Sequence, residues 1–158
     1  MSAKCYRMSF DGHVLKRGFW IYIWKVKCPQ ETFYYVGRTG DSSSPHAASP
    51  FTRIGQHLDF RANAKGNSLS KQLQRCRVKP DDCCFEMLAI GPLFPEQRGM
   101  EKHTPFRDKV SAIEKALGGV LRERGLSVLS QQHCKKPLDG SLFRQVVKII
   151  DRKKFILS

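Results

Sequence analysis

The stretch FWIYIWKVK at residues 19–27, with TFYYVGR shortly after it at residues 32–38, decides the fold that the sequence predicts. Aromatic and β-branched residues dominate both runs, and such residues favour extended strands. The intervening CPQE, at residues 28–31, contains Pro29, which breaks regular structure and indicates a turn. We therefore expect the two runs to pair as an antiparallel hairpin.

Two helices are expected after this hairpin. The polar, small-residue stretch at 39–49 is typical of a loop. It ends in Ser49 followed by Pro50, residue types that are preferred at a helix N-cap and at the first helical position. The apolar spacing that follows predicts a helix over residues 50–63 and a second, shorter helix over residues 67–76.

The second half of the chain supplies one more strand and two more helices. Residues 84–90 are predicted as a strand, and residues 91–105, which are rich in proline and glycine, as a loop. Helices are predicted over 106–124 and 141–153, with a short extended piece at 126–130 between them. This order predicts an α+β fold in which helices flank a small, mostly antiparallel, three-stranded sheet.

A length of 158 residues fits one domain. We expect residues 1–158 to form it, with a core at about 19–124 and a C-terminal helical extension at about 139–154. No apolar run approaches the roughly 20 residues that span a membrane. The N-terminal residues lack the apolar core of a signal peptide. We therefore expect a cytoplasmic protein without a membrane partner.

The chain is strongly basic. Its 28 lysine and arginine residues outnumber its 14 aspartate and glutamate residues, which gives a net charge of +14. Residues 1–80 contain 14 basic and 4 acidic side chains, so the N-terminal half carries most of this excess. A positive field attracts polyanions, of which nucleic acid is the most common. Charge alone is also compatible with a basic protein that has no special partner.

The six cysteines show no arrangement typical of a zinc site. No Cys-x-x-Cys pair occurs, and two of the cysteines are adjacent. In a reducing compartment such thiols are most simply buried or inert. The sequence therefore assigns no function to any of them, namely Cys5, Cys28, Cys76, Cys83, Cys84 and Cys134.

Glu114 breaks the pattern of the helix predicted at 106–124. It follows the apolar Val110 by four positions and precedes Leu117 by three, so it falls on the edge of the buried stripe. A carboxylate in a poorly solvated place needs a cation beside it. A metal ion and an arginine such as Arg53 would satisfy this need equally well.

Arg53 and His57 are spaced four apart, so they share one face of the helix predicted at 50–63, and Arg61 extends the same row. An arginine can hold a phosphate through two hydrogen bonds, and a histidine can exchange a proton near neutral pH. A solvated basic face is the more common meaning of such spacing. Tyr22 and Tyr35 lie inside the predicted strands, where a tyrosine is commonly a core residue with one hydrogen bond.

Together these residues resemble a known family. Trp20-Ile21-Tyr22 and Tyr35-Val36-Gly37 resemble the paired tripeptides that name the GIY-YIG nucleases. In that family two short strands carry the tripeptides, the next helix carries an arginine, and a later helix carries a metal-binding glutamate. The spacing Arg53-x-x-x-His57 is similar to that of a branch containing certain restriction endonucleases. The resemblance covers residues 19–124.

The chain departs from the family pattern at several places. Trp20 replaces the first glycine, Val36 replaces isoleucine, and the loop at 39–49 is longer than the family's shortest versions. Many members also carry an asparagine after the metal glutamate. No asparagine follows Glu114, so Ser127 or Ser130 is the expected substitute.

The resemblance implies a DNA endonuclease that hydrolyses phosphodiester bonds with one Mg²⁺ or Mn²⁺ ion. It assigns the metal to Glu114, the phosphate to Arg53, the general base to Tyr22 and its proton acceptor to His57, with Tyr35 orienting the water or phosphate. The choice between Tyr22 and His57 as the general base remains open.

DNA contacts are expected from three further basic residues, Arg38, Arg61 and Lys25. A compact free-standing chain favours a restriction-type or phage-type enzyme, and a homodimer would cut both strands of a duplex. The alternative is a nucleic-acid-binding module that keeps the fold but does not cleave.

Overall fold

The computed structural model describes residues 2–156. These residues form four strands and four α-helices, together with two short 3-10 helices, in an α+β arrangement. In chain order these elements are η1 (Gly12–Leu15), β1 (Phe19–Lys27), β2 (Thr32–Arg38), α1 (Pro50–His57), α2 (Ser68–Arg75), η2 (Pro80–Asp82), β3 (Cys84–Phe94), α3 (Met100–Glu123), β4 (Ser127–Val128) and α4 (Gly140–Lys153).

The four strands form one mixed sheet in the order β3-β1-β2-β4. The central strand β1 pairs antiparallel with both β2 and β3, which confirms the predicted hairpin. The expected count of three strands is wrong, because the short extended piece at 126–130 adds β4 to the edge of β2 in parallel, with Phe33 opposite Ser127. A strand of two residues is too short to show an alternating pattern in the sequence.

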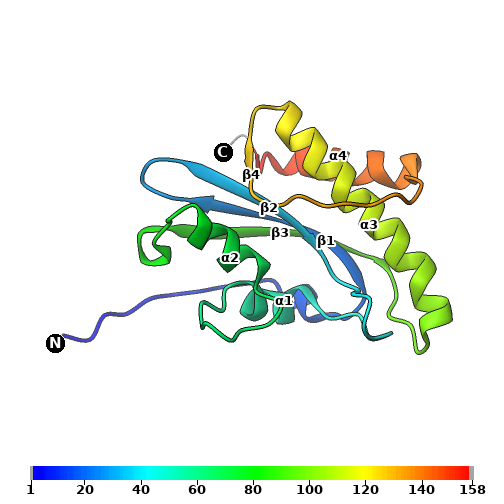
Figure 1. Ribbon diagram of the computed structural model, residues 1–158, viewed down its shortest axis with the longest axis horizontal. Coiled ribbons are helices and arrows are strands. Elements are labelled where there is room, and N and C mark those ends of the chain that lie inside the picture. The colour runs from blue at the N-terminus through cyan, green and yellow to red at the C-terminus, as the bar shows by residue number, and fades with distance from the viewer. Residues whose placement is uncertain (1, 157–158) are drawn as a thin grey trace.

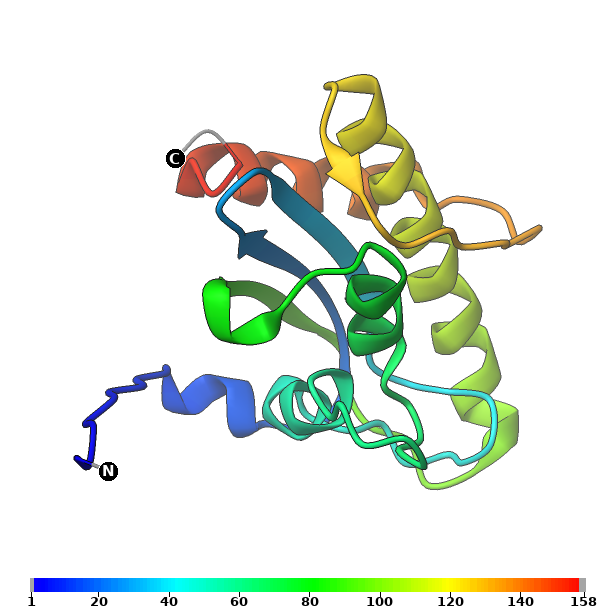
Figure 2. The same cartoon turned by 60° about the vertical axis from the view of Figure 1, so that its left-hand side comes forward.

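The helices cover the two faces of this sheet separately (Figure 1, Figure 2). Successive side chains of a strand point to opposite faces. Ile21 and Ile23 of β1 therefore pack with residues of α3 and α4 in one hydrophobic cluster. Tyr22 and Trp24 pack in a second cluster that includes residues of α1 and α2. This alternation directs Tyr22 toward the α1 and α2 layer.

The proline-rich segment at 91–105 is not the loop that the sequence predicts. Strand β3 continues to Phe94, which lies opposite Phe19 of β1. Pro92 is tolerated because β3 is an edge strand of the sheet. Helix α3 then begins at Met100 and includes Pro105 near its N-terminal end, where the ring removes only one hydrogen bond from a long helix.

Helix α1 is shorter than predicted and ends at His57. Beyond it the Asp59 carboxylate accepts hydrogen bonds from the backbone and side chain of Arg61. The Asp59 carbonyl accepts hydrogen bonds from Asn67 and Ser70, which ties the turn to the start of α2.

Within residues 2–156, no helix has both the length and the apolar character required to cross a bilayer.

Candidate active site

A cavity of about 370 Å³ opens between the sheet, α1 and α3, and all five candidate residues line it. They come from four elements that lie far apart in the sequence. Their positions are Tyr22 on β1, Tyr35 on β2, Arg53 and His57 on α1, and Glu114 on α3.

The Tyr22 hydroxyl sits between two polar partners inside this cavity. Its oxygen lies 2.6 Å from His57 Nε2 and 3.1 Å from the carbonyl oxygen of Arg38. Gly37 lies directly opposite Tyr22 in the β1–β2 ladder, and its missing side chain makes room for the tyrosine ring. Burial raises the pKa of Tyr22 well above its usual value, and the nearby Arg53 charge opposes that shift.

His57 is buried and remains neutral. Burial and, to a smaller extent, the Arg53 charge together lower its pKa to about 3. Its Nε2 atom faces the Tyr22 hydroxyl and also lies 3.5 Å from Arg53 Nη2. A guanidinium can only donate, so we assign the lone pair of the neutral ring to Nε2. His57 is thus placed to accept the Tyr22 proton.

Arg53 keeps donors available inside the cavity. Its Nη1 group donates to Gln56, and its Nη2 group faces His57. The buried Nε atom has no hydrogen-bond partner among the described residues. A buried donor on a cation is costly to leave unpaired. An anion in the cavity would satisfy it.

Glu114 pairs with Arg38 instead of Arg53. Arg38 Nε donates to Glu114 Oε2 across 3.1 Å, and both side chains are mostly buried. Burial raises the pKa of Glu114 to about 7, while the Arg38 charge and a hydrogen bond from Gln132 act in the opposite direction. The carboxylate therefore remains only partly compensated, as expected for a group that can accept a further cation.

Tyr35 completes the ring of candidate side chains. Its ring centroid lies 5.2 Å from that of His57, in an edge-to-face arrangement. Burial raises its pKa, and the negative charge of Glu114 adds to the increase, while a hydrogen bond with Ser68 opposes it.

Gln132 was missed by the sequence analysis. Its side-chain amide donates to the Val36 carbonyl at 2.8 Å and also hydrogen-bonds Glu114. Neither serine suggested for such a role lines the cavity. Ser127 bonds Glu31, and Ser130 accepts the backbone N–H of Val36. In the sequence, Gln132 is an amide side chain that follows Glu114, as the asparagine of the family does.

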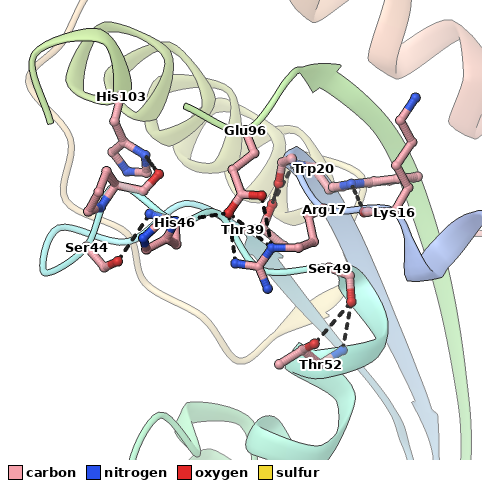
Figure 3. A network of polar contacts seen from close by, with 12 residues as sticks. Lys16, Arg17, Trp20, Thr39, Ser44, His46, Ser49, Thr52, Glu96 and His103 are labelled. Atoms are coloured by element: carbon pink, nitrogen blue, oxygen red, sulfur yellow. Dashed lines mark hydrogen bonds and ion pairs between the residues drawn. The ribbon is translucent and has the colours of Figure 1, made fainter. Parts of the chain in front are cut away.

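The loop between β2 and α1 supplies further cavity residues, among them Asp41, Ser44 and His46. Two residues outside this loop, His103 and Glu96, contact it, as Figure 3 shows. His103 of α3 is buried, and its ring nitrogens lie 2.9 Å from the carbonyls of Pro45 and Asp41. Glu96 binds Arg17 through two nitrogens and lies 3.5 Å from His46 Nδ1.

Two of the three basic residues expected to bind DNA lie outside the cavity, and only Arg38 lines it. Lys25 is 2% exposed and donates to the Phe155 carbonyl, because odd-numbered residues of β1 face the α3 and α4 layer. Arg61 lies beyond the end of α1 and binds Asp59, so it does not extend the row of Arg53 and His57.

The acidic side chains at the cavity are few. Glu114 and Asp41 line it, and nowhere in residues 2–156 do three or more histidine, cysteine, aspartate or glutamate side chains form a group that could hold a metal ion. Magnesium commonly binds through one or two carboxylates and keeps several waters. A partly compensated carboxylate facing a polar cavity fits that mode of binding.

In comparisons with known proteins, no family model matches the chain, and no curated protein or solved structure matches it significantly.

Proposed function

We propose that this protein is a divalent-metal-dependent DNA endonuclease with the GIY-YIG nuclease fold. One observation carries the proposal: Tyr22, Tyr35, Arg53, His57 and Glu114, drawn from two strands and two helices, line the same cavity. The net charge of +14 supports a polyanionic substrate.

Phosphodiester hydrolysis needs an activated water, a charge clamp on the phosphate and a stabilised leaving oxygen. Arg53 binds the scissile phosphate through its buried Nε, which has no hydrogen-bond partner among the described residues. As the water oxygen attacks phosphorus, its proton passes to the Tyr22 oxygen while the Tyr22 proton passes to His57 Nε2 across 2.6 Å. This transfer avoids a free phenolate, which the raised pKa of Tyr22 makes costly. The imidazolium that it forms is disfavoured by the lowered pKa of His57, so the transfer depends on the negative charge of the bound phosphate.

Glu114 would hold the Mg²⁺ or Mn²⁺ ion, which when bound supplies positive charge to the phosphate and the leaving oxygen. Arg38 fixes the orientation of the Glu114 carboxylate through their ion pair. Tyr35, whose ring packs edge-to-face against His57, orients the phosphate or the attacking water. The family resemblance further implies products with a 5′-phosphate and a 3′-hydroxyl.

The test is nicking of a supercoiled plasmid with and without Mg²⁺. We expect Glu114→Ala, Arg53→Ala and Tyr22→Phe each to lower the rate by at least about 10²-fold while DNA binding is largely retained. Arg61→Ala is the matched control for Arg53→Ala, because Arg61 lies outside the cavity and is paired with Asp59. Its rate should equal that of the unmodified protein.

Other outcomes separate the parts of the proposal. Full activity in EDTA would contradict the role of the metal ion. Unimpaired cutting by Glu114→Ala would contradict the assignment of Glu114 as its ligand. DNA binding without cleavage in Mg²⁺ and in Mn²⁺ would favour the binding-only alternative. Digestion of defined single-stranded and duplex DNA, followed by mapping of the ends, would then identify the substrate.

A further inference from the structure

Cys28 and Cys83 lie outside the active-site cavity, and their Sγ atoms are 2.7 Å apart. A disulfide bond is about 2.05 Å long, so the two sulfur atoms are less than an ångström from bonding distance. Cys28 follows the last residue of β1, and Cys83 precedes the first residue of β3. Fifty-five positions separate them in the sequence.

The sheet register accounts for this proximity. Lys27 and Cys84 are the last pair in the antiparallel ladder between β1 and β3. The next pair outward in the same register is Cys28 with Cys83. Opposed residues in antiparallel strands have Cα atoms about 4.5–5.5 Å apart, which lies within the range of about 4.4–6.8 Å that disulfides span. The register of the sheet thus places the two cysteines beside each other at the end of the ladder.

Local hydrogen bonds hold both backbone positions. The N–H of Cys28 donates to the Glu31 carbonyl at 2.9 Å, and the N–H of Cys83 donates to the Pro80 carbonyl at 3.1 Å. Both residues also line a second cavity of about 400 Å³, which admits a small reagent. Cys76 lines the same cavity and supplies a natural competitor for either thiol.

We propose that Cys28 and Cys83 are a covalent-modification site, at which a peroxide-class oxidant converts the two thiols into a reversible disulfide. This proposal does not depend on the nuclease activity. It assigns a role to two cysteines to which the sequence assigns none.

The oxidation balances with one peroxide. The Cys83 thiol loses its proton, and its sulfur attacks a peroxide oxygen. An S–O bond forms, the O–O bond breaks, and the hydroxide that leaves takes up that proton to form one water. The Cys28 sulfur then attacks the Cys83 sulfur, the S–S bond forms, and hydroxide leaves with the Cys28 proton as a second water. Two electrons pass from the sulfurs to the peroxide. Burial and the neighbouring Cys83 raise the pKa of Cys28 to about 12, so Cys28 resolves the intermediate instead of starting the reaction.

The new bond would close a loop that contains β2, α1 and α2. This loop carries most of the residues that line the first cavity, among them Tyr35, Arg53 and His57. A cross-link across 55 positions removes conformational freedom from the unfolded chain. We expect the oxidised protein to melt about 10 °C above the reduced protein.

The experiment treats the full chain with hydrogen peroxide and measures its intact mass, its free thiols and its Tm before and after reduction with dithiothreitol. Oxidation should remove two hydrogen atoms and two of the six thiols. After alkylation and trypsin digestion, the fragment 28–38 should be linked to the fragment 78–98. Because the second fragment contains both Cys83 and Cys84, the digest is repeated on Cys84→Ser, which should still cross-link.

Matched variants identify the pair. Cys28→Ser and Cys83→Ser should each lose the cross-link and the rise in Tm, whereas Cys76→Ser should keep both. The proposal is overturned if fragment 28–38 links to the fragment containing Cys76, or if the exposed Cys5 oxidises while Cys28 and Cys83 remain thiols. The digest of the unmodified chain gives the answer even where a variant fails to fold. Plasmid nicking is not a readout, so failure here leaves the proposed function untouched.

Discussion

At Glu114, the burial that raises its pKa to about 7 also determines how folding stability depends on pH. A carboxyl group whose pKa is higher in the folded state than the unfolded value of 4.5 stabilises fully below pH 4.5. That contribution is lost as the pH rises through 7. For a side chain only 12% exposed, the loss amounts to about 3 kcal/mol.

We therefore expect Glu114→Gln, which stays neutral, to remove this pH dependence. The free energy of unfolding of the unmodified chain, minus that of the variant, should fall by about 3 kcal/mol between pH 4.5 and pH 8. Urea unfolding across that range measures it. Glu123→Gln, an exposed change on the same helix, controls for the loss of one carboxylate. A parallel pH dependence in Glu114→Gln and the unmodified chain would contradict the burial argument.

The metal assignment of Glu114 has a readout that does not require cleavage. A ligand that binds only the folded state raises Tm, and the stabilisation grows with the logarithm of one plus the ratio of the free ligand concentration to Kd. We expect millimolar Mg²⁺ at pH 8 to raise the Tm of the unmodified chain but not that of Glu114→Gln. Equal shifts in both proteins would place the ion elsewhere.

Gly37 controls the position of the Tyr22 ring. A Cβ atom at Gly37 would lie 2.8 Å from the Tyr22 hydroxyl oxygen and closer still to the ring edge, so Gly37→Ala must displace the tyrosine. We expect nicking to fall by about 10²-fold and the free energy of unfolding to fall by about 1–3 kcal/mol.

Gly55→Ala is the matched control for Gly37→Ala. A Cβ atom there meets no atom within 4 Å, and its helix α1 carries Arg53 and His57. The change should leave nicking intact and stabilise the fold by about 0.5–1 kcal/mol. Normal activity in Gly37→Ala would show that the Tyr22 ring tolerates the shift.

Among the elements, β1 and β2 match their predicted bounds because their aromatic and β-branched residues and the proline turn between them determine these bounds locally. The end of α1 and the length of β3 were mispredicted because contacts outside each element decide them. Asp59 stops α1 through its own hydrogen bonds, and the edge position of β3 allows Pro92 inside a strand. Local sequence contains neither of these facts.

The same limit applies to the site. Its five candidate residues were named from the sequence through a family resemblance, and they do meet in one cavity. The pairing of Arg38 with Glu114 across 76 positions was not foreseen, nor was the role of Gln132. Both depend on how α3 crosses the edge of β2, which no spacing along one element encodes.

Helix α3 contains two adjacent glycines that should respond differently to alanine. At Gly119 a Cβ atom meets nothing within 4 Å, so Gly119→Ala should stabilise the fold by about 1 kcal/mol through helix propensity. At Gly118 the Cβ atom would approach Gln132 Oε1 to 3.3 Å. Gly118→Ala should therefore raise the free energy of unfolding by less. It should also slow nicking, because Gln132 bonds Glu114. Thermal unfolding compares the stability of the two variants. An equal increase in both would show that Gln132 moves freely.

At the scale of the whole molecule, a net charge of +14 makes DNA binding an electrostatic event. If the protein neutralises about six to ten phosphates, its affinity for a duplex should fall by about 10³–10⁵ between 50 and 200 mM salt. Fluorescence anisotropy in EDTA measures this without cleavage.

Two variants determine which face of the protein makes the phosphate contacts that cause this salt dependence. Arg53→Ala should lower the slope of log affinity against log salt by about one, because Arg53 lines the cavity that holds the phosphate. Lys148→Ala should leave the slope unchanged, since Lys148 is exposed on α4, which covers the opposite face of the sheet from α1 and α2 (Figure 1). The reverse result would move the DNA-binding surface to the α4 side, where Tyr22 and Arg53 could not reach the phosphate, and would contradict the active site proposed for this cavity.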